Sequence, residues 1–139
     1  DIGLANPNAL LMATTAFQAA TAVGLPEARI ILSQATVYLA TSPKSNSTYM
    51  AINKAQQLVR ETGGLSVPLE IRNAPTTLMK NLNYGKGYKY AHAEKGNFAE
   101  MEFLPEEIKG TTLFEPSENP TEEKIRLKMR SLWKEKYGY

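Results

Sequence analysis

The 139-residue chain has room for one domain with its own core, and it contains no cysteine. That composition excludes a disulfide framework, cysteine-ligated zinc and a cysteine nucleophile. The formal net charge is only +2, from 16 lysines and arginines against 14 acidic residues. Any nucleic-acid interface must therefore be local rather than spread over the whole surface.

The chain begins with an uncharged stretch between Asp1 and Glu27. A membrane-spanning helix needs about 20 strongly apolar residues. This stretch is instead rich in alanine, is interrupted by threonines and Gln18, and is bounded by Pro7 and Pro26. We therefore expect a buried helix and no membrane partner. Because the chain opens on Asp rather than Met, we also expect it to be an excised domain or a processed product.

The first expected helix lies between Pro7 and Gly24. Asn6 precedes the proline and is a typical N-cap, because a proline is tolerated in the first turn. Gly24 is a typical helix stop. The apolar residues that recur at helical spacing are Leu10, Ala13, Phe17 and Ala20.

Two more helices are expected before residue 65. The second starts at residues 25–27 and closes at 41–43, where Thr-Ser-Pro ends it. The third starts among Ser45 to Ser47 and stops at Gly63-Gly64. Its expected apolar face comprises Tyr49, Ile52, Gln56 and Val59. Short connections between the three helices predict an antiparallel bundle over residues 1–64.

The first two helices are apolar on more than one side, and alanines on them permit close helix approach. A helix that is apolar all round must be covered all round. Either the rest of the chain covers these helices, or a second copy does, because an obligate homo-oligomer interface resembles a core cut in half. The candidate core or interface residues are Leu10, Phe17, Val23, Ile31 and Tyr38.

Residues 65–139 lack the sustained helical period of the first 64 residues and contain many turn residues and isolated aromatic residues. Residues 66–73 suit a short edge strand or an extended connection, since Pro68 disfavours a central strand. A short helix capped by residues 74–77 should follow. Residues 83–120 are expected to form an irregular wrap over the bundle, with a one-turn helix within EFLPEEIKG. Residues 121–136 predict a terminal helix with an apolar stripe and a basic remainder.

No catalytic, cofactor-binding or metal site is predicted. The GKG at residues 85–87 has the wrong spacing for a P-loop. His92 is the sole histidine and no G-x-S-x-G element is present, which argues against a nucleophilic triad. We expect His92 to donate a hydrogen bond to a nearby carbonyl. The paired glutamates at 106–107 and 122–123 are expected to be solvated carboxylates at helix starts.

The stretch YGKGYKYAH at residues 84–92 interleaves lysines with tyrosines, and no acidic residue lies between Glu70 and Glu94. Lysines neutralise phosphates, and tyrosine rings stack on exposed bases. Alternatively, the tyrosines pack on the bundle while the lysines face water. The candidate DNA contacts are Lys80, Lys86, Tyr88 and Lys89.

The order of motifs in the chain adds a family resemblance. The segment from residue 1 to 55, followed by GKGYKYAH, EFLPEEIKG and LFEP, resembles the C-terminal region of the replication-associated recombination protein A family. These AAA+ ATPases are also called MgsA, and they include the Werner-helicase-interacting protein. The chain departs from the family's GYKYPHD, since Ala91 and Ala93 stand in place of the proline and the aspartate. This departure weakens any shared role for His92.

The resemblance implies a mainly all-α, post-AAA+ oligomerisation domain, similar to the collar of clamp-loader subunits, spanning residues 1–139. It implies a homotetramer, with ATP and Mg²⁺ bound in a preceding ATPase core and no cofactor in this part. It also implies that the parent protein acts on DNA at stalled replication forks, in the bacterial cytoplasm at the nucleoid. Single-stranded-DNA-binding protein is an implied partner.

Overall fold

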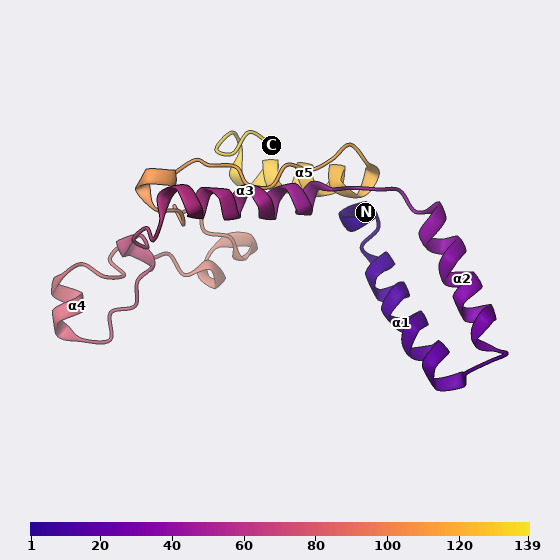
Figure 1. The fold of residues 1–139 in the computed structure, drawn as a ribbon. Coiled ribbons are helices and arrows are strands. Elements are labelled where there is room, and N and C mark those ends of the chain that lie inside the picture. The colour runs from indigo at the N-terminus through magenta and orange to yellow at the C-terminus, as the bar shows by residue number, and fades with distance from the viewer. The chain divides into compact units, whose positions relative to one another are not determined.

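The computed structural model describes residues 1–139 without a gap, and helices are its only regular secondary structure, as predicted (Figure 1). The α-helices are α1 (Asn8–Val23), α2 (Ala28–Thr41), α3 (Ser47–Thr62), α4 (Thr77–Asn81) and α5 (Pro120–Trp133). The 3-10 turns are η1 (Gly3–Ala5), η2 (Leu69–Ile71), η3 (Ala91–Ala93), η4 (Lys95–Asn97) and η5 (Glu106–Ile108). No strand forms, so residues 66–73 are a connection that contains η2.

The chain folds into two compact units. Residues 1–54 and 113–127 form the first, and residues 55–112 and 128–139 form the second. The division therefore falls inside α3 and α5 rather than near residue 64. None of the helices combines the length and hydropathy that crossing a bilayer requires.

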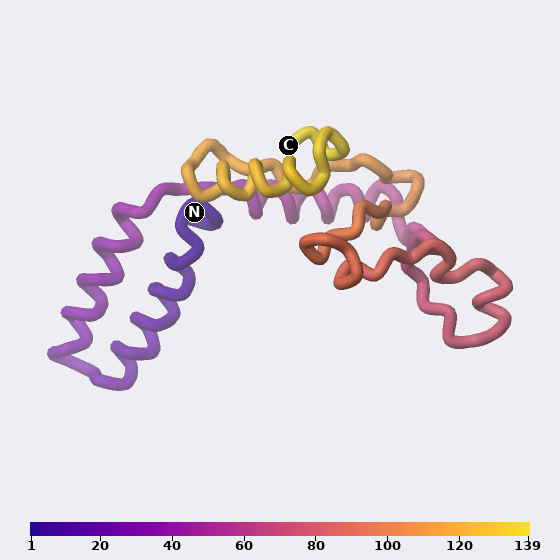
Figure 2. Tube along the Cα trace, turned by 180° about the vertical axis from the view of Figure 1, so that it is seen from behind, coloured from indigo at the N-terminus to yellow at the C-terminus, as the bar shows by residue number.

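In the first unit, α1 and α2 lie side by side and antiparallel, in a hairpin that the ribbon of Figure 1 and the Cα tube of Figure 2 both show. Among the α-helices, only this pair is in extensive contact. The predicted bundle over residues 1–64 was therefore wrong for the third helix, because α3 does not pack extensively against α1 or α2. The reason is local: α2 ends on Ser42 in an extended conformation, with Pro43 next, and the chain does not fold back onto the pair.

The expected apolar face of α3 was also wrong. Tyr49, Ile52 and Val59 are exposed, whereas Ala51, Ala55 and Leu58 occupy the half-buried face. Helical spacing identifies both sets equally well, because each repeats every three or four residues. The face that the chain covers carries two alanines and a leucine, whereas Tyr49 and Ile52 remain in solvent.

Two glycines fix the ends of the α1–α2 hairpin. Gly24 ends α1 at a φ of 68°, and its N–H donates to the Ala20 carbonyl at 3.0 Å, as the sequence predicted. Gly3, at a φ of 51°, lies against the start of α3, and a Cβ there would be 2.8 Å from the Ser45 carbonyl oxygen. Only glycine fits that approach without displacing backbone.

Aromatic side chains of the second unit gather around Trp133, the last residue of α5. The helix therefore ends three residues before Lys136, where its end was predicted. The Phe98 and Tyr137 rings meet the indole edge-on, with centroids 4.9 and 5.1 Å away. Lys136 lies 4.9 Å from the indole centroid and forms an ion pair with Glu102 at 3.0 Å. Residues 83–112 are irregular, as predicted, and they belong to this unit.

Candidate functional site

The seam of the α1–α2 hairpin is made of alanine. Ala9 and Ala16 are the buried residues of α1, and Ala28 and Ala35 are those of α2. On each helix the pair is seven residues apart, which is two helical turns and places both on one face. Small side chains let the two helices approach closely, but they remove little apolar surface from water. The larger apolar side chains consequently remain outside the seam.

These larger side chains form the first candidate site, an apolar surface on the hairpin. Phe17 is 72% exposed and Leu10 is 78% exposed, so the core interpretation was wrong for both, and also for Val23. Single exposed leucines are ordinary, whereas a contiguous apolar surface marks an interaction site. The exposed apolar residues of the hairpin and its turn are Leu10, Leu11, Phe17, Val23, Leu25, Ile30, Leu32 and Val37.

The other two candidates, Ile31 and Tyr38, are half-buried within the chain. The Tyr38 hydroxyl accepts a hydrogen bond from Asn6 Nδ2 at 3.0 Å, and the same amide donates to Ser42 Oγ at 3.0 Å. Asn6 therefore links the segment that precedes α1 to the C-terminal end of α2 by hydrogen bonds. The prediction that it caps α1 was wrong, since Pro7 stands at the N-cap without a side-chain cap.

An apolar cavity of about 600 Å³ opens at the base of the hairpin, where the chain enters α1 and leaves α2. Ile2, Leu4, Leu10 and Leu39 supply most of its apolar wall, and Asp1 and Thr48 are among its polar residues. We call it the base cavity.

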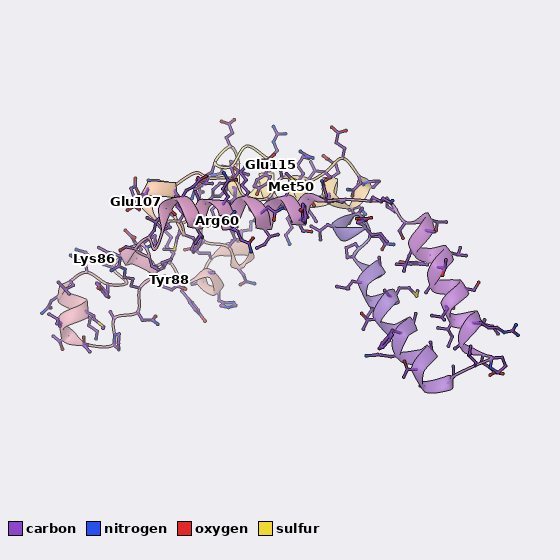
Figure 3. The ribbon with its side chains drawn as sticks, viewed as in Figure 1. Met50, Arg60, Lys86, Tyr88, Glu107 and Glu115 are labelled. Carbon is purple, nitrogen blue, oxygen red and sulfur yellow. The ribbon has the colours of Figure 1, made fainter.

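The basic loop, residues 80–90, is the second candidate site. Lys80, Lys86 and Lys89 are exposed, and so is Tyr88. Figure 3 labels Lys86 and Tyr88. The expectation that the tyrosines pack away was wrong for Tyr88, which is 54% exposed. Tyr84 is half-buried instead, with the Arg72 guanidinium 5.1 Å from its ring centroid.

The fold brings carboxylates to Lys89 that the sequence separates from it. A cavity of about 470 Å³ is lined by Lys89 together with Glu70, Glu100, Glu102 and Glu106, among others. Three of these carboxylates already pair with lysines other than Lys89, namely Glu100 with Lys134, Glu102 with Lys136 and Glu106 with Lys109. The absence of acidic residues between 70 and 94 therefore overstated how basic the loop's surroundings are.

His92 takes no part in a site. It is exposed, its ring lies 5.3 Å from that of Tyr90, and it makes no hydrogen bond to a carbonyl, contrary to the prediction. No group of three or more histidine, cysteine or acidic side chains is placed to hold a metal ion.

Glu122 is the residue that sequence reasoning misjudged most. It was predicted to be solvated, yet it has 0% exposure. Its carboxylate accepts hydrogen bonds from the Ser117 N–H at 2.9 Å and from Asn119 Nδ2 at 3.0 Å. In return, the Glu122 N–H donates to Asn119 Oδ1 at 2.9 Å, which caps α5. The pattern Asn-Pro-x-Glu was the available signal, with N-cap, N1 and N3 positions in order.

The surroundings of Glu122 set its pKa well below the ordinary value of 4.5. Burial raises the pKa, but hydrogen bonds from the Ser45 side chain, the Ser117 N–H, the Ser47 side chain and Asn119 outweigh it and hold the pKa at about 2. The carboxylate thus joins the α2–α3 connection to the start of α5.

This depressed pKa predicts an acid-sensitive first unit. The stabilisation is complete above the unfolded-state pKa near 4.5 and is lost as pH falls toward about 2. The difference between those values corresponds to roughly 3 kcal/mol. Urea denaturation at pH 7, 4 and 2.5 should show the loss in the parent chain and a flatter profile in Glu122→Gln. Parallel profiles for the two proteins would contradict the assignment.

Comparison with known proteins adds the family. The family model described as "MgsA AAA+ ATPase C terminal" matches residues 1–133. Replication-associated recombination protein A of Coxiella burnetii is 45% identical over 130 residues, covering 93% of this chain and 30% of that protein. The Escherichia coli protein of the same name is 42% identical over 130 residues, covering 93% and 29%.

The similarity extends to a eukaryote. The protein named ATPase WRNIP1 of Dictyostelium discoideum is 40% identical over 117 residues, covering 83% of this chain and 13% of that protein. This chain thus spans less than a third of the length of each of these relatives.

Proposed function

We propose that this chain, which belongs to the family of MgsA AAA+ ATPase C-terminal domains, is a non-catalytic self-association module. It holds copies of a longer ATPase together, with a homotetramer as the assembled form. ATP and Mg²⁺ would be bound outside these residues, and the assembled protein would act in replication-associated recombination, the process that names its relatives.

The observation that carries this proposal is the apolar surface of the α1–α2 hairpin. Leu10, Phe17 and Leu25 are each more than 70% exposed, on a hairpin whose own seam is only alanine. Burying a large apolar side chain contributes about 1.5–3 kcal/mol. Several such side chains per copy are enough to offset the entropy lost on association.

Multi-angle light scattering of this 139-residue chain over a wide concentration range tests the proposal. We expect a mass that rises to a multiple of 15.4 kDa. A mass that stays at 15.4 kDa at high protein concentration would contradict self-association through these residues.

The exposed ring of Tyr88 supports a second candidate function, direct DNA binding by the basic loop. A ring that is 54% exposed beside Lys86 and Lys89 can stack on an unpaired base while the ammonium groups meet phosphates. This role is compatible with self-association. In the cell it would place the protein at the nucleoid, alongside single-stranded-DNA-binding protein as a partner.

A paired substitution, Lys86→Ala with Lys89→Ala, should weaken binding of a single-stranded oligonucleotide. Losing two phosphate contacts should also lower the slope of log K against log salt by about 1.4. Fluorescence anisotropy at several salt concentrations measures both. Lys124→Ala with Lys128→Ala removes two exposed lysines of α5 and serves as the control. Equal effects of the two pairs would exclude a specific role for the basic loop.

A further inference from the structure

We infer that two copies of the chain pack their α1–α2 hairpins antiparallel, with the tip of each hairpin seated in the base cavity of the other. This inference rests on the proposed self-association and specifies its geometry. It follows from three features of the first unit: a projecting apolar tip, a cavity at the opposite end, and charges confined to the two ends.

The tip carries the most exposed large apolar side chain of the protein. Leu25, in the turn between α1 and α2, is 81% exposed, and Val23 and Ile30 beside it are 53% and 66% exposed. The Leu25 side chain has no partner in its own hairpin to cover it. An apolar residue at the end of a projecting hairpin is well placed to enter a hollow on another molecule.

The matching hollow lies at the other end of the same hairpin. The base cavity, about 600 Å³, has a mainly apolar wall, and Leu10, itself 78% exposed, stands at it. Packing two hairpins in parallel would set base beside base and leave both cavities unfilled. Antiparallel packing brings a tip to each cavity, and filled contacts are favoured because protein interfaces reach the density of protein interiors.

A twofold axis across the two hairpins forms both tip-to-base contacts at once. In an interface with such symmetry, if the tip of one copy contacts the base of its partner, the partner's tip contacts the first copy's base. Phe17 lies close to the midpoint of α1 (Asn8–Val23), so the same axis brings the two Phe17 residues near each other at the centre. Central, fully covered aromatic residues commonly dominate interface energetics.

The charges are compatible with this arrangement. α1 carries no charged residue, and α2 carries only Arg29, near the tip. Glu27 adds an acidic group at the tip, while Asp1 and Lys44 lie at the base. None of these four forms an ion pair within the chain. Antiparallel packing brings the tip pair to the base pair, so that an opposite charge is available at the partner's end for each of the four.

Cysteine cross-linking tests the geometry, because the natural chain has no cysteine. Leu10→Cys and Leu25→Cys are made separately, one with a size tag, and the two proteins are mixed and oxidised mildly. Both positions are exposed, so neither change should disturb the single chain. We expect the mixed Leu10→Cys/Leu25→Cys disulfide as the main product, because a disulfide needs Cα atoms within about 7 Å.

The control mixes Leu25→Cys with Lys124→Cys, an exposed position on α5. Thiols in contact within an assembly react at effective concentrations in the mM range, against µM in free solution. The mixed tip–base disulfide should therefore form about 100-fold faster than the control, or more.

Two outcomes would overturn the antiparallel geometry while leaving self-association intact. One is a Leu25→Cys homodimer as the main product, which indicates parallel hairpins. The other is no cross-link above the control, although light scattering shows assembly. A monomeric mass for the unmodified chain would instead remove the proposed function itself.

Discussion

Replacing Phe17 with aspartate should break the hairpin–hairpin interface and lower the mass of the assembled protein without unfolding the chain. In the single chain Phe17 is 72% exposed, so the substitution removes no internal packing. In an assembly the buried ring is worth about 1.5–3 kcal/mol, and a twofold interface loses it twice. The association constant should fall by about 10² to 10⁴ from this loss alone. Burying the new carboxylate adds to the penalty.

Light scattering and circular dichroism, measured together, check this prediction. Leu127→Asp is the matched control, because Leu127 is an exposed leucine of α5, 58% exposed, outside the hairpin. A Phe17→Asp protein that keeps the parent mass would show that the hairpin surface is not the interface. A protein that loses its helical signal would show that Phe17 supports the fold of a single chain.

Phe17→Ala should leave the stability of the single chain nearly unchanged. For a fully buried phenylalanine, truncation to alanine costs about 3–5 kcal/mol. Exposed positions away from special features usually change stability by no more than about 0.5 kcal/mol. Unfolding of dilute, monomeric Phe17→Ala should therefore match the parent chain. Any loss of stability should emerge only at concentrations where the parent assembles.

The second large effect is expected at Glu122. Glu122→Ala leaves the Ser117 N–H and the Asn119 side-chain amide without their acceptor in a buried place. Each buried donor left unpaired costs about 1–3 kcal/mol, so the loss of two should cost the first unit roughly 2–6 kcal/mol. Because Ser45 and Ser47 share this network, the connection before α3 should loosen as well.

Glu123→Ala is the matched control for Glu122→Ala. Glu123 is the next residue of α5, and its side chain is 51% exposed in an ion pair with Arg126. Exposed pairs contribute about 0–1 kcal/mol. Urea denaturation in the Phe17→Asp background avoids the concentration dependence of an oligomer. Similar losses for the two glutamates would show that the network around Glu122 contributes little.

The sequence determined the local elements of this protein. Gly24 and Gly63-Gly64 stand where α1 and α3 end, Thr76 caps α4 through the Met79 N–H, and η5 forms where a one-turn helix was predicted. These features depend on backbone conformations that a few neighbouring residues fix. The alanines of α1 and α2 likewise permitted the close pairing that the hairpin shows.

Only the tertiary structure decided which surfaces are covered. The helical spacing of Leu10 and Phe17 does not distinguish a core from an interface. Both environments are apolar, so the sequence pattern is the same whether the chain itself or a second copy covers these residues. Glu122 reads as an ordinary acidic residue at a helix start until Ser45 and Ser117, far apart in the sequence, enclose it. Helical period is a local property, whereas burial depends on residues that are distant along the chain, and no local pattern specifies those.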